Sequence, residues 1–140
     1  MDWNNSLFEN KVRKIDANEN KIKQLQISAL KRKSFVDSHP ITDSNSSVLI
    51  TELYNAAEQL VNAVIESYGF QVDTKECSHY FLRDVLSNNF ICNSMKQYEK
   101  LCREITSQGR NISAKEGLQI IQELKFLLEE LQKEVRYSRR

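Results

Sequence analysis

The sequence predicts an all-α protein, an antiparallel up-and-down bundle of about five helices forming one domain over all 140 residues. Glycine occurs only three times and proline once, which leaves too few turn formers for a β-rich fold of this length. Apolar residues recur at spacings of three and four along most of the chain, the period of one face of an α-helix. The connections between the later helices are short, so these helices are expected to run antiparallel to their neighbours.

The first 36 residues are predicted to form one long helix, at about residues 6–36. Its apolar positions fall on one helical face: Leu7, Phe8, Val12, Ile15, Ile22, Leu25, Ala29 and Leu30. This face is thin between Asp16 and Lys21, but no glycine or proline interrupts it, so one helix is favoured over two. Residues 37–46 follow as a linker, because Pro40 cannot continue a helix. The Ser, Asp and Asn residues of this linker are expected to supply an N-cap for the next helix.

Residues 47–135 are predicted to form the core of the bundle. The strongest helix spans about 48–68, where a broad apolar stripe indicates a central element and Leu60 is expected to be buried. Gly69 follows at the position where helices end in a left-handed residue. Residues 70–73 are expected to form a short turn.

The third and fourth helices are predicted at about 75–87 and 90–107. Thr74 is a candidate N-cap of the third helix. Within the fourth, Ser94 and Gln97 have the spacing of a capping box, so this helix begins either near residue 90 or near residue 94.

The fifth helix begins after a clearer capping box. Ser113 is expected to accept a hydrogen bond from the amide of Glu116, whose side chain reaches back to the amide of Ser113. The apolar stripe of this helix continues to about Val135.

Charge and cysteine usage restrict the function classes. The net charge of +1 argues against a surface dedicated to coating nucleic acid, and the basic residues near both ends, including Arg136, Arg139 and Arg140, are expected to lie on solvated helix faces. Three cysteines without CxxC spacing indicate a reducing compartment and buried thiols. No segment has the roughly 18 apolar residues of a membrane span or the pattern of a signal peptide, so a cytoplasmic protein is expected.

The sequence contains no clear pattern of catalytic or metal-binding residues. His39 lies in the linker and is expected to be exposed, while His79 lies early in the third helix. Cys77 and His79 are two residues apart, so on a helix they face different directions and do not suggest a metal site. Cys102 is expected to be an inert thiol on the inward face of its helix. No glycine-rich phosphate loop is present, and no metal or other cofactor is predicted.

The most suggestive polar group surrounds the turn between the last two helices. Its members are Arg103, Glu104, Gln108, Gly109, Arg110 and Asn111. Arginine matches phosphate geometry, and the helix that starts at Ser113 adds partial positive charge, so this group is a candidate ligand-binding site for a phosphate or a nucleotide. The alternative is that these side chains are surface groups flanking a helical turn.

Three stretches together resemble the HEPN superfamily, helical domains often paired with minimal nucleotidyltransferases. They are YNAAEQLVNAVIESYGFQV (54–72), ECSHYFLRDVL (76–86) and YEKLCREITSQGRNISAKEGLQIIQELKFLLEEL (98–131). The resemblance implies a homodimer, a nucleotidyltransferase-type protein partner, and a metal-independent RNase motif of an arginine, a polar residue and a following histidine.

Arg103 and Glu104 match the first two positions of that motif, but the window for its histidine holds Gln108, Gly109 and Arg110. Glutamine does not titrate and arginine stays charged, so neither replaces the histidine as an acid or base. His79 belongs to another helix and is not expected to reach Arg103.

The sequence therefore predicts a HEPN-like bundle that acts by binding a nucleotidyltransferase, a nucleotide or RNA, without full nuclease activity. Two alternatives remain open: an active RNase toxin of a toxin–antitoxin pair, and a helical assembly module.

Overall fold

The structure is a computed structural model that describes residues 2–137. Its elements in chain order are α1 (Trp3–Phe8), β1 (Val12–Lys14), α2 (Glu19–Asp37), α3 (Ser46–Ser67), β2 (Phe70–Val72), α4 (Lys75–Tyr80), the π-helical turn η1 (Phe81–Val85), α5 (Asn89–Gln108) and α6 (Ala114–Glu134). Arg139 and Arg140, expected on a solvated helix face, lie outside the described residues.

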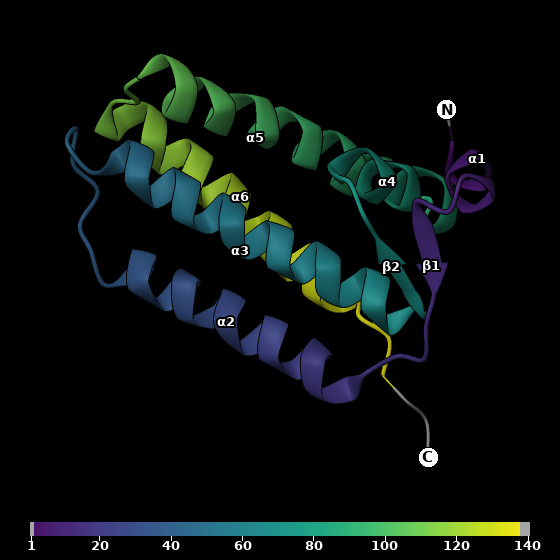
Figure 1. The fold of residues 1–140 in the computed structure, drawn as a ribbon. Helices are drawn as coiled ribbons and strands as arrows, with labels where there is room; N and C mark the ends of the chain where they lie inside the picture. Colours follow the sequence, from purple (N-terminus) through teal and green to yellow (C-terminus); the bar gives the residue numbers. More distant parts are fainter. Residues whose placement is uncertain (1, 138–140) are drawn as a thin grey trace.

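Four long helices form the bundle, and α3 is at its centre. Helices α2, α3, α5 and α6 alternate in direction, and α2 and α5 lie on opposite sides of α3 (Figure 1). Both α2 and α6 pack extensively against α3. The side chains that fill this core are fully buried and apolar, among them Ile50, Leu53, Ile91, Leu124 and Leu127. The all-α bundle predicted from the sequence is confirmed, as is the burial of Leu60.

The prediction of one long helix at residues 6–36 is wrong. The segment contains α1, the strand β1 and then α2. Asn10 adopts a left-handed conformation with φ of 61°, which ends helical geometry after α1. The side chain of Asn18 accepts a hydrogen bond from the amide of Lys21 at 3.1 Å and so caps a new helix at Glu19. The thin region of the apolar face was therefore a helix boundary.

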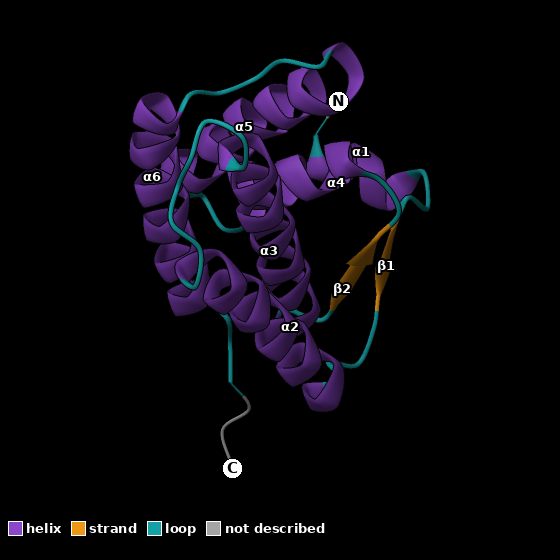
Figure 2. Ribbon diagram, turned by 90° about the vertical axis from the view of Figure 1, so that its left-hand side faces the viewer, coloured by secondary structure: helices purple, strands orange, loops and turns teal. Residues whose placement is uncertain are grey.

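The turn predicted at residues 70–73 is also corrected, because Phe70–Val72 is the strand β2. It pairs antiparallel with β1, with Val12 opposite Val72 and Lys14 opposite Phe70. Gly69 precedes β2 with φ of +82°, as expected for a helix-ending glycine, and its carbonyl accepts from the amide of Ile15 at 2.9 Å. Figure 2 shows this small sheet beside α1 and α4, at one end of the bundle.

Four aromatic rings hold the N-terminal segment against the bundle. Trp3 makes edge contacts with Phe70 and Phe81, with ring centroids 5.1 and 5.5 Å apart, and Tyr68 contacts Phe81 at 5.3 Å. The amide of Trp3 donates to Asp84 Oδ2 at 3.0 Å. These contacts join α1 to β2 and η1.

The caps of α4 and α5 fix the remaining boundaries in this half of the chain. Thr74 accepts from the amide of Cys77 at 3.2 Å and caps α4 as predicted. The predicted helix over 75–87 is, however, six residues of α-helix followed by η1. Asn88 accepts from the amide of Ile91 at 3.0 Å, so α5 begins at Asn89, and a start near Ser94 is excluded.

The linker between α2 and α3 is tied to the start of α6. Ser113 accepts from the amide of Glu116 at 3.2 Å, which confirms that half of the predicted capping box. Asp43 of the linker accepts from the amide of Ala114 at 2.7 Å. The side chain expected to cap α3 does not do so, because Asn45 instead accepts from the amide of Thr42 inside the linker. Among residues 2–137, every helix is too short or too polar to cross a membrane.

Candidate functional site

The polar group predicted around the α5–α6 turn divides into two separate clusters. Arg103 and Glu104 are consecutive on α5 and therefore point roughly 100° apart around the helix axis. Nη2 of Arg103 lies 3.8 Å from Oε1 of Glu99, one turn earlier on the same helix. Oε2 of Glu104 lies 2.7 Å from Nη1 of Arg110, in the turn after α5.

The cluster in the turn is already neutralised by the chain's own carboxylates. The guanidinium of Arg110 lies between Glu104 and Glu116, with Nη2 3.9 Å from Oε2 of Glu116. Gly109, with φ of +69°, ends α5 and allows the amide of Arg110 to donate to the carbonyl of Glu104. The first amide of α6 is bonded to Asp43. An incoming phosphate would have to displace these groups.

The remaining predicted side chains of the turn do not strengthen a site there. Gln108, the last residue of α5, and Asn111 are both exposed to solvent. The prediction that Gln108, Arg110 and Asn111 bind a ligand therefore stays a prediction. Of the predicted site residues, Arg103 is the better candidate, because its guanidinium is exposed and lies 3.8 Å from one carboxylate.

The second cluster joins Arg103 to a histidine from another helix. Nε2 of His79 on α4 lies 3.3 Å from Oε2 of Glu99, while Arg103 approaches the other oxygen of the same carboxylate. The expectation that His79 stays remote from Arg103 is wrong, because α4 packs against α5 and brings both side chains to Glu99. We refer to His79, Glu99 and Arg103 as the α4–α5 site.

The environment of His79 favours its neutral form. Burial lowers the pKa of the imidazole, the positive charges of Lys96 and Lys75 lower it further, and Glu99 opposes both effects. With its proton on Nε2, the neutral ring donates to Glu99 and keeps a lone pair on Nδ1. Arg103 carries permanent positive charge beside it and is well exposed, at 64% of its side-chain surface.

Two hollows border the α4–α5 site. The inner one, of about 30 Å³, is lined by His79, Lys75 and Tyr54 among others, and has room for about one water molecule. The outer one, of about 370 Å³, is lined by Lys11, Lys75, Tyr80 and Glu99. A ligand would therefore lie on the surface near the outer hollow, because the inner hollow is too small for a nucleobase.

Lys75 and Tyr54, which border the site, have partners within the protein. Nζ of Lys75 lies 3.6 Å from Oε2 of Glu58 and 5.8 Å from the ring centre of Tyr54. Burial is the main cause of the raised pKa of Tyr54, with Glu58 and Glu99 adding to it. Tyr54 is therefore a neutral hydroxyl at physiological pH.

The cysteines of the chain are buried thiols. Burial raises the pKa of the Cys102 thiol to about 11, so the thiol stays protonated, in agreement with the inert role predicted for it. All three cysteines are free and buried, also as predicted. Within the part of the chain that the structure describes, no group of three or more His, Cys, Asp or Glu residues is arranged to hold a metal ion.

Sequence reasoning missed Glu99 and His79 for different reasons. Glu99 and Arg103 have the i,i+4 spacing of a helical ion pair, so their contact was visible in the sequence. The contact of His79 depends on how α4 packs against α5, and no local spacing encodes it.

No protein-family model, curated protein or solved structure matches this chain. Its resemblance to HEPN domains therefore rests on the three stretches quoted above. A helical bundle by itself hosts many unrelated activities, so the function depends on the α4–α5 site rather than on the fold.

Proposed function

We propose that this chain is a HEPN-like helical domain that binds a phosphate-bearing ligand, RNA or a nucleotide, at the α4–α5 site. The observation that carries the proposal is the convergence of His79 and Arg103 on the carboxylate of Glu99. Glu99 attracts the exposed guanidinium of Arg103 at 3.8 Å, and a guanidinium offers a planar fork of donors that suits phosphate oxygens. Lys75 and Lys96 add positive charge on the same face.

The dimensions of the site favour RNA over a free nucleotide. The inner hollow of about 30 Å³ does not admit a base, whereas the outer hollow is open and bordered by Lys11, Lys75 and Tyr80. A strand lying across the surface can place a phosphate at Arg103 and stack a base on an aromatic ring. Tyr80 lines the outer hollow; its ring is half-buried and the guanidinium of Arg83 lies over it at 5.3 Å, so a base would stack on the part of this ring that remains open.

Binding of a labelled single-stranded RNA and of ATP, measured by fluorescence anisotropy and calorimetry, tests this proposal. Arg103→Ala is expected to weaken RNA binding about tenfold, since it removes a charge-assisted contact. Arg110→Ala is the matched control, because Arg110 is already paired with Glu104 and Glu116. Equal RNA binding by the wild type and Arg103→Ala, or no binding by either, would refute the proposal.

A second candidate function is metal-independent RNA cleavage, and the neutral imidazole of His79 favours it. Its Nδ1 would accept the 2′-hydroxyl proton while the 2′-oxygen bonds to phosphorus and the bond to the 5′-oxygen breaks. The leaving 5′-oxygen takes a proton from solvent, and Arg103 stabilises the charge on the phosphate. In this reading His79 replaces the histidine that is missing after Arg103.

Incubation of a structured RNA with the protein in the presence of EDTA separates cleavage from binding. Cleavage that persists in EDTA, is lost in His79→Ala and is kept in His39→Ala would establish the nuclease. Growth arrest on expression, relieved by His79→Ala, would further indicate a toxin. Intact RNA in every reaction would leave only the binding function.

The resemblance also motivates proposals about partners. We propose a nucleotidyltransferase-type protein partner and a homodimer, as the resemblance implies. Co-purification from native extract followed by mass spectrometry tests the first, and sedimentation equilibrium tests the second. A monomer across the concentration range would contradict the homodimer.

A further inference from the structure

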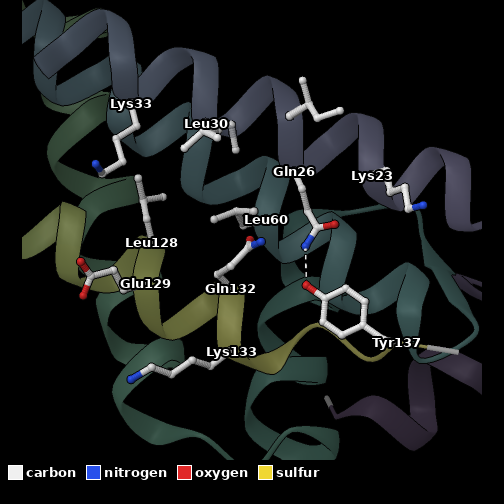
Figure 3. A pocket seen from close by; sticks show the side chains of 12 residues that line it. Lys23, Gln26, Leu30, Lys33, Leu60, Leu128, Glu129, Gln132, Lys133 and Tyr137 are labelled. Carbon is white, nitrogen blue, oxygen red and sulfur yellow. Dashed lines mark hydrogen bonds between the residues drawn. The ribbon is translucent and has the colours of Figure 1, made fainter. Parts of the chain in front are cut away.

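A groove of about 670 Å³ runs between α2 and α6, separate from the α4–α5 site. Its floor is formed by the buried side chains of Ala29, Leu60 and Leu128. Figure 3 shows Leu30 on the α2 wall, with Leu60 and Leu128 below it. Nε2 of Gln26 donates to the hydroxyl of Tyr137 at 3.1 Å and bridges one end of the groove (Figure 3).

The wall that α2 contributes exposes large apolar side chains to solvent. Ile27 is 54% exposed and Leu30 is 62% exposed, and both line the groove. They stand beside an apolar floor, so together they form a continuous patch rather than isolated surface residues. Such patches mark sites where another molecule is bound.

The length of the groove suits a short helix. Its lining on α2 runs from Lys23 to Lys33, a distance of about 15 Å along the helix, or about three turns. The groove lies between two helices that both pack on α3, so an added helix would extend the bundle by one element. An amphipathic helix binds such a groove through apolar residues spaced three and four apart.

The charges around the groove identify the chemistry of this helix. Lys23, Lys33 and Lys133 line it together with Glu129, and Lys133 is paired with Glu130, 3.0 Å away. Lys23 forms no ion pair with any other residue in the 2–137 range that the structure describes. Lys33 shares the carboxylate of Asp37 with Lys125, so two ammonium groups face one negative charge. The α2 wall is therefore basic and is complementary to acidic side chains.

We infer that the α2–α6 groove binds an acidic amphipathic helix of another protein. The apolar stripe of that helix packs on Leu30, Leu60 and Leu128, and its carboxylates face Lys23 and Lys33. A second copy of this chain is a poorer occupant. A two-fold contact centred on Ile27 and Leu30 would bring Lys23 of one copy toward Lys33 of the other, and like charges at an interface are unfavourable.

Two synthetic peptides of about four helical turns test the inference by fluorescence anisotropy. Both carry leucines at i, i+3, i+4 and i+7; one is flanked by glutamates and the other by lysines. The glutamate peptide is expected to bind saturably, and the lysine peptide about tenfold more weakly or not at all.

Matched variants locate the binding site. Leu30→Asp is expected to weaken binding of the glutamate peptide about tenfold or more, because it places a charge in the apolar wall. Leu118→Asp is its control, since Leu118 is similarly exposed on α6 but lies outside the groove. Lys23→Glu should reduce the preference for the glutamate peptide, whereas Lys31→Glu, on α2 but outside the lining, should not.

Three outcomes would overturn the inference. One is the absence of saturable binding of the glutamate peptide to the wild type. The second is binding that Leu30→Asp leaves unchanged. The third is a concentration-dependent dimer in sedimentation that Leu30→Asp abolishes, which would assign the groove to a second copy. Because none of these variants touches His79, Glu99 or Arg103, RNA binding by the same variants reports separately on the proposed function.

Discussion

Gly117 lies where α6 crosses the start of α3, and the contact leaves no room for a side chain. A Cβ at this position would stand 1.8 Å from Oγ of Ser46 and 3.0 Å from its Cβ. Ser46 is fully buried, and its hydroxyl donates to the carbonyl of Ser113 at 3.2 Å. The close approach therefore depends on glycine, although this residue is inside a helix.

Gly117→Ala is expected to lower the free energy of unfolding by about 1–3 kcal/mol, measured by urea denaturation. At an open helical position the same change would instead stabilise by about 1 kcal/mol. The double variant Ser46→Ala, Gly117→Ala should recover part of the loss, because the hydroxyl that meets the new methyl group is removed. Unchanged or increased stability of the single variant would contradict the packing of α6 on α3.

His79 makes stability depend on pH near neutrality. Burial lowers the pKa of the imidazole in the folded protein below its ordinary value of 6.5, so below about pH 6.5 the unfolded chain binds a proton that the folded chain does not. The free energy of unfolding should therefore fall as the pH drops through this range, until the folded protein is protonated too.

Urea denaturation of the wild type and of His79→Gln measures this dependence. It is carried out between about pH 7.5 and about pH 5, an interval that brackets the ordinary pKa of histidine. The variant should lose less stability on acidification than the wild type. His39→Gln serves as the control, since His39 is exposed in the linker as predicted and should leave the wild-type dependence in place. Parallel curves for wild type and His79→Gln would contradict the buried, neutral imidazole.

At the scale of elements, α1 and β1 depend on one side chain. Trp3 is 6% exposed and contacts the rings of Phe70 and Phe81. Trp3→Ala is expected to lower the free energy of local opening of the N-terminal segment by about 3 kcal/mol, measured as faster proteolysis within residues 9–18. Phe8→Ala, at a position 90% exposed on the same helix, should change stability by less than about 0.5 kcal/mol.

The elements predicted correctly from the sequence are specified by neighbouring residues, whereas the missed elements depend on residues far apart in the chain. The stripe of α3, the left-handed Gly69 and the caps Thr74 and Ser113 are local signals, and each is confirmed. The strands β1 and β2 contain three residues each, too few to show alternation, and their pairing joins positions 56 to 60 residues apart. Their existence follows from tertiary contacts.

In the candidate site too, the local contacts were predictable from the sequence and the contacts between helices were not. Arg103 and Glu104 were identified from the sequence, and the ion pair of Arg103 with Glu99 lies within one helical turn. The contact between His79 and Glu99 joins two helices, and the neutralisation of Arg110 depends on where the start of α6 lies. Only the fold shows that Arg110 is paired with two carboxylates, whereas Arg103 lies 3.8 Å from one.

At the scale of the whole molecule, α3 is enclosed by its neighbours, while α1 and β1 rest on one end of the bundle. Ile50, Leu53, Ala57 and Val64 of α3 are essentially inaccessible to solvent, and α2 and α6 both cover this helix. Their amides can exchange only when the bundle opens as a unit, so the exchange of α3 should report the global free energy of unfolding. The short N-terminal segment has fewer buried contacts and should open locally.

Native-state hydrogen exchange followed by mass spectrometry should therefore find the slowest amides in α3 and much faster ones in α1. Leu53→Ala, which removes a fully buried side chain, should lower the opening free energy of α3 by about 2–5 kcal/mol. It should leave the exchange of α1 almost unchanged, because α1 opens without unfolding α3. Trp3→Ala should do the reverse, with faster exchange in α1 and little change in α3 under conditions where local opening dominates. If each variant accelerated both helices equally, the two ends of the chain would form one cooperative unit, and the division between bundle and N-terminal segment would be wrong.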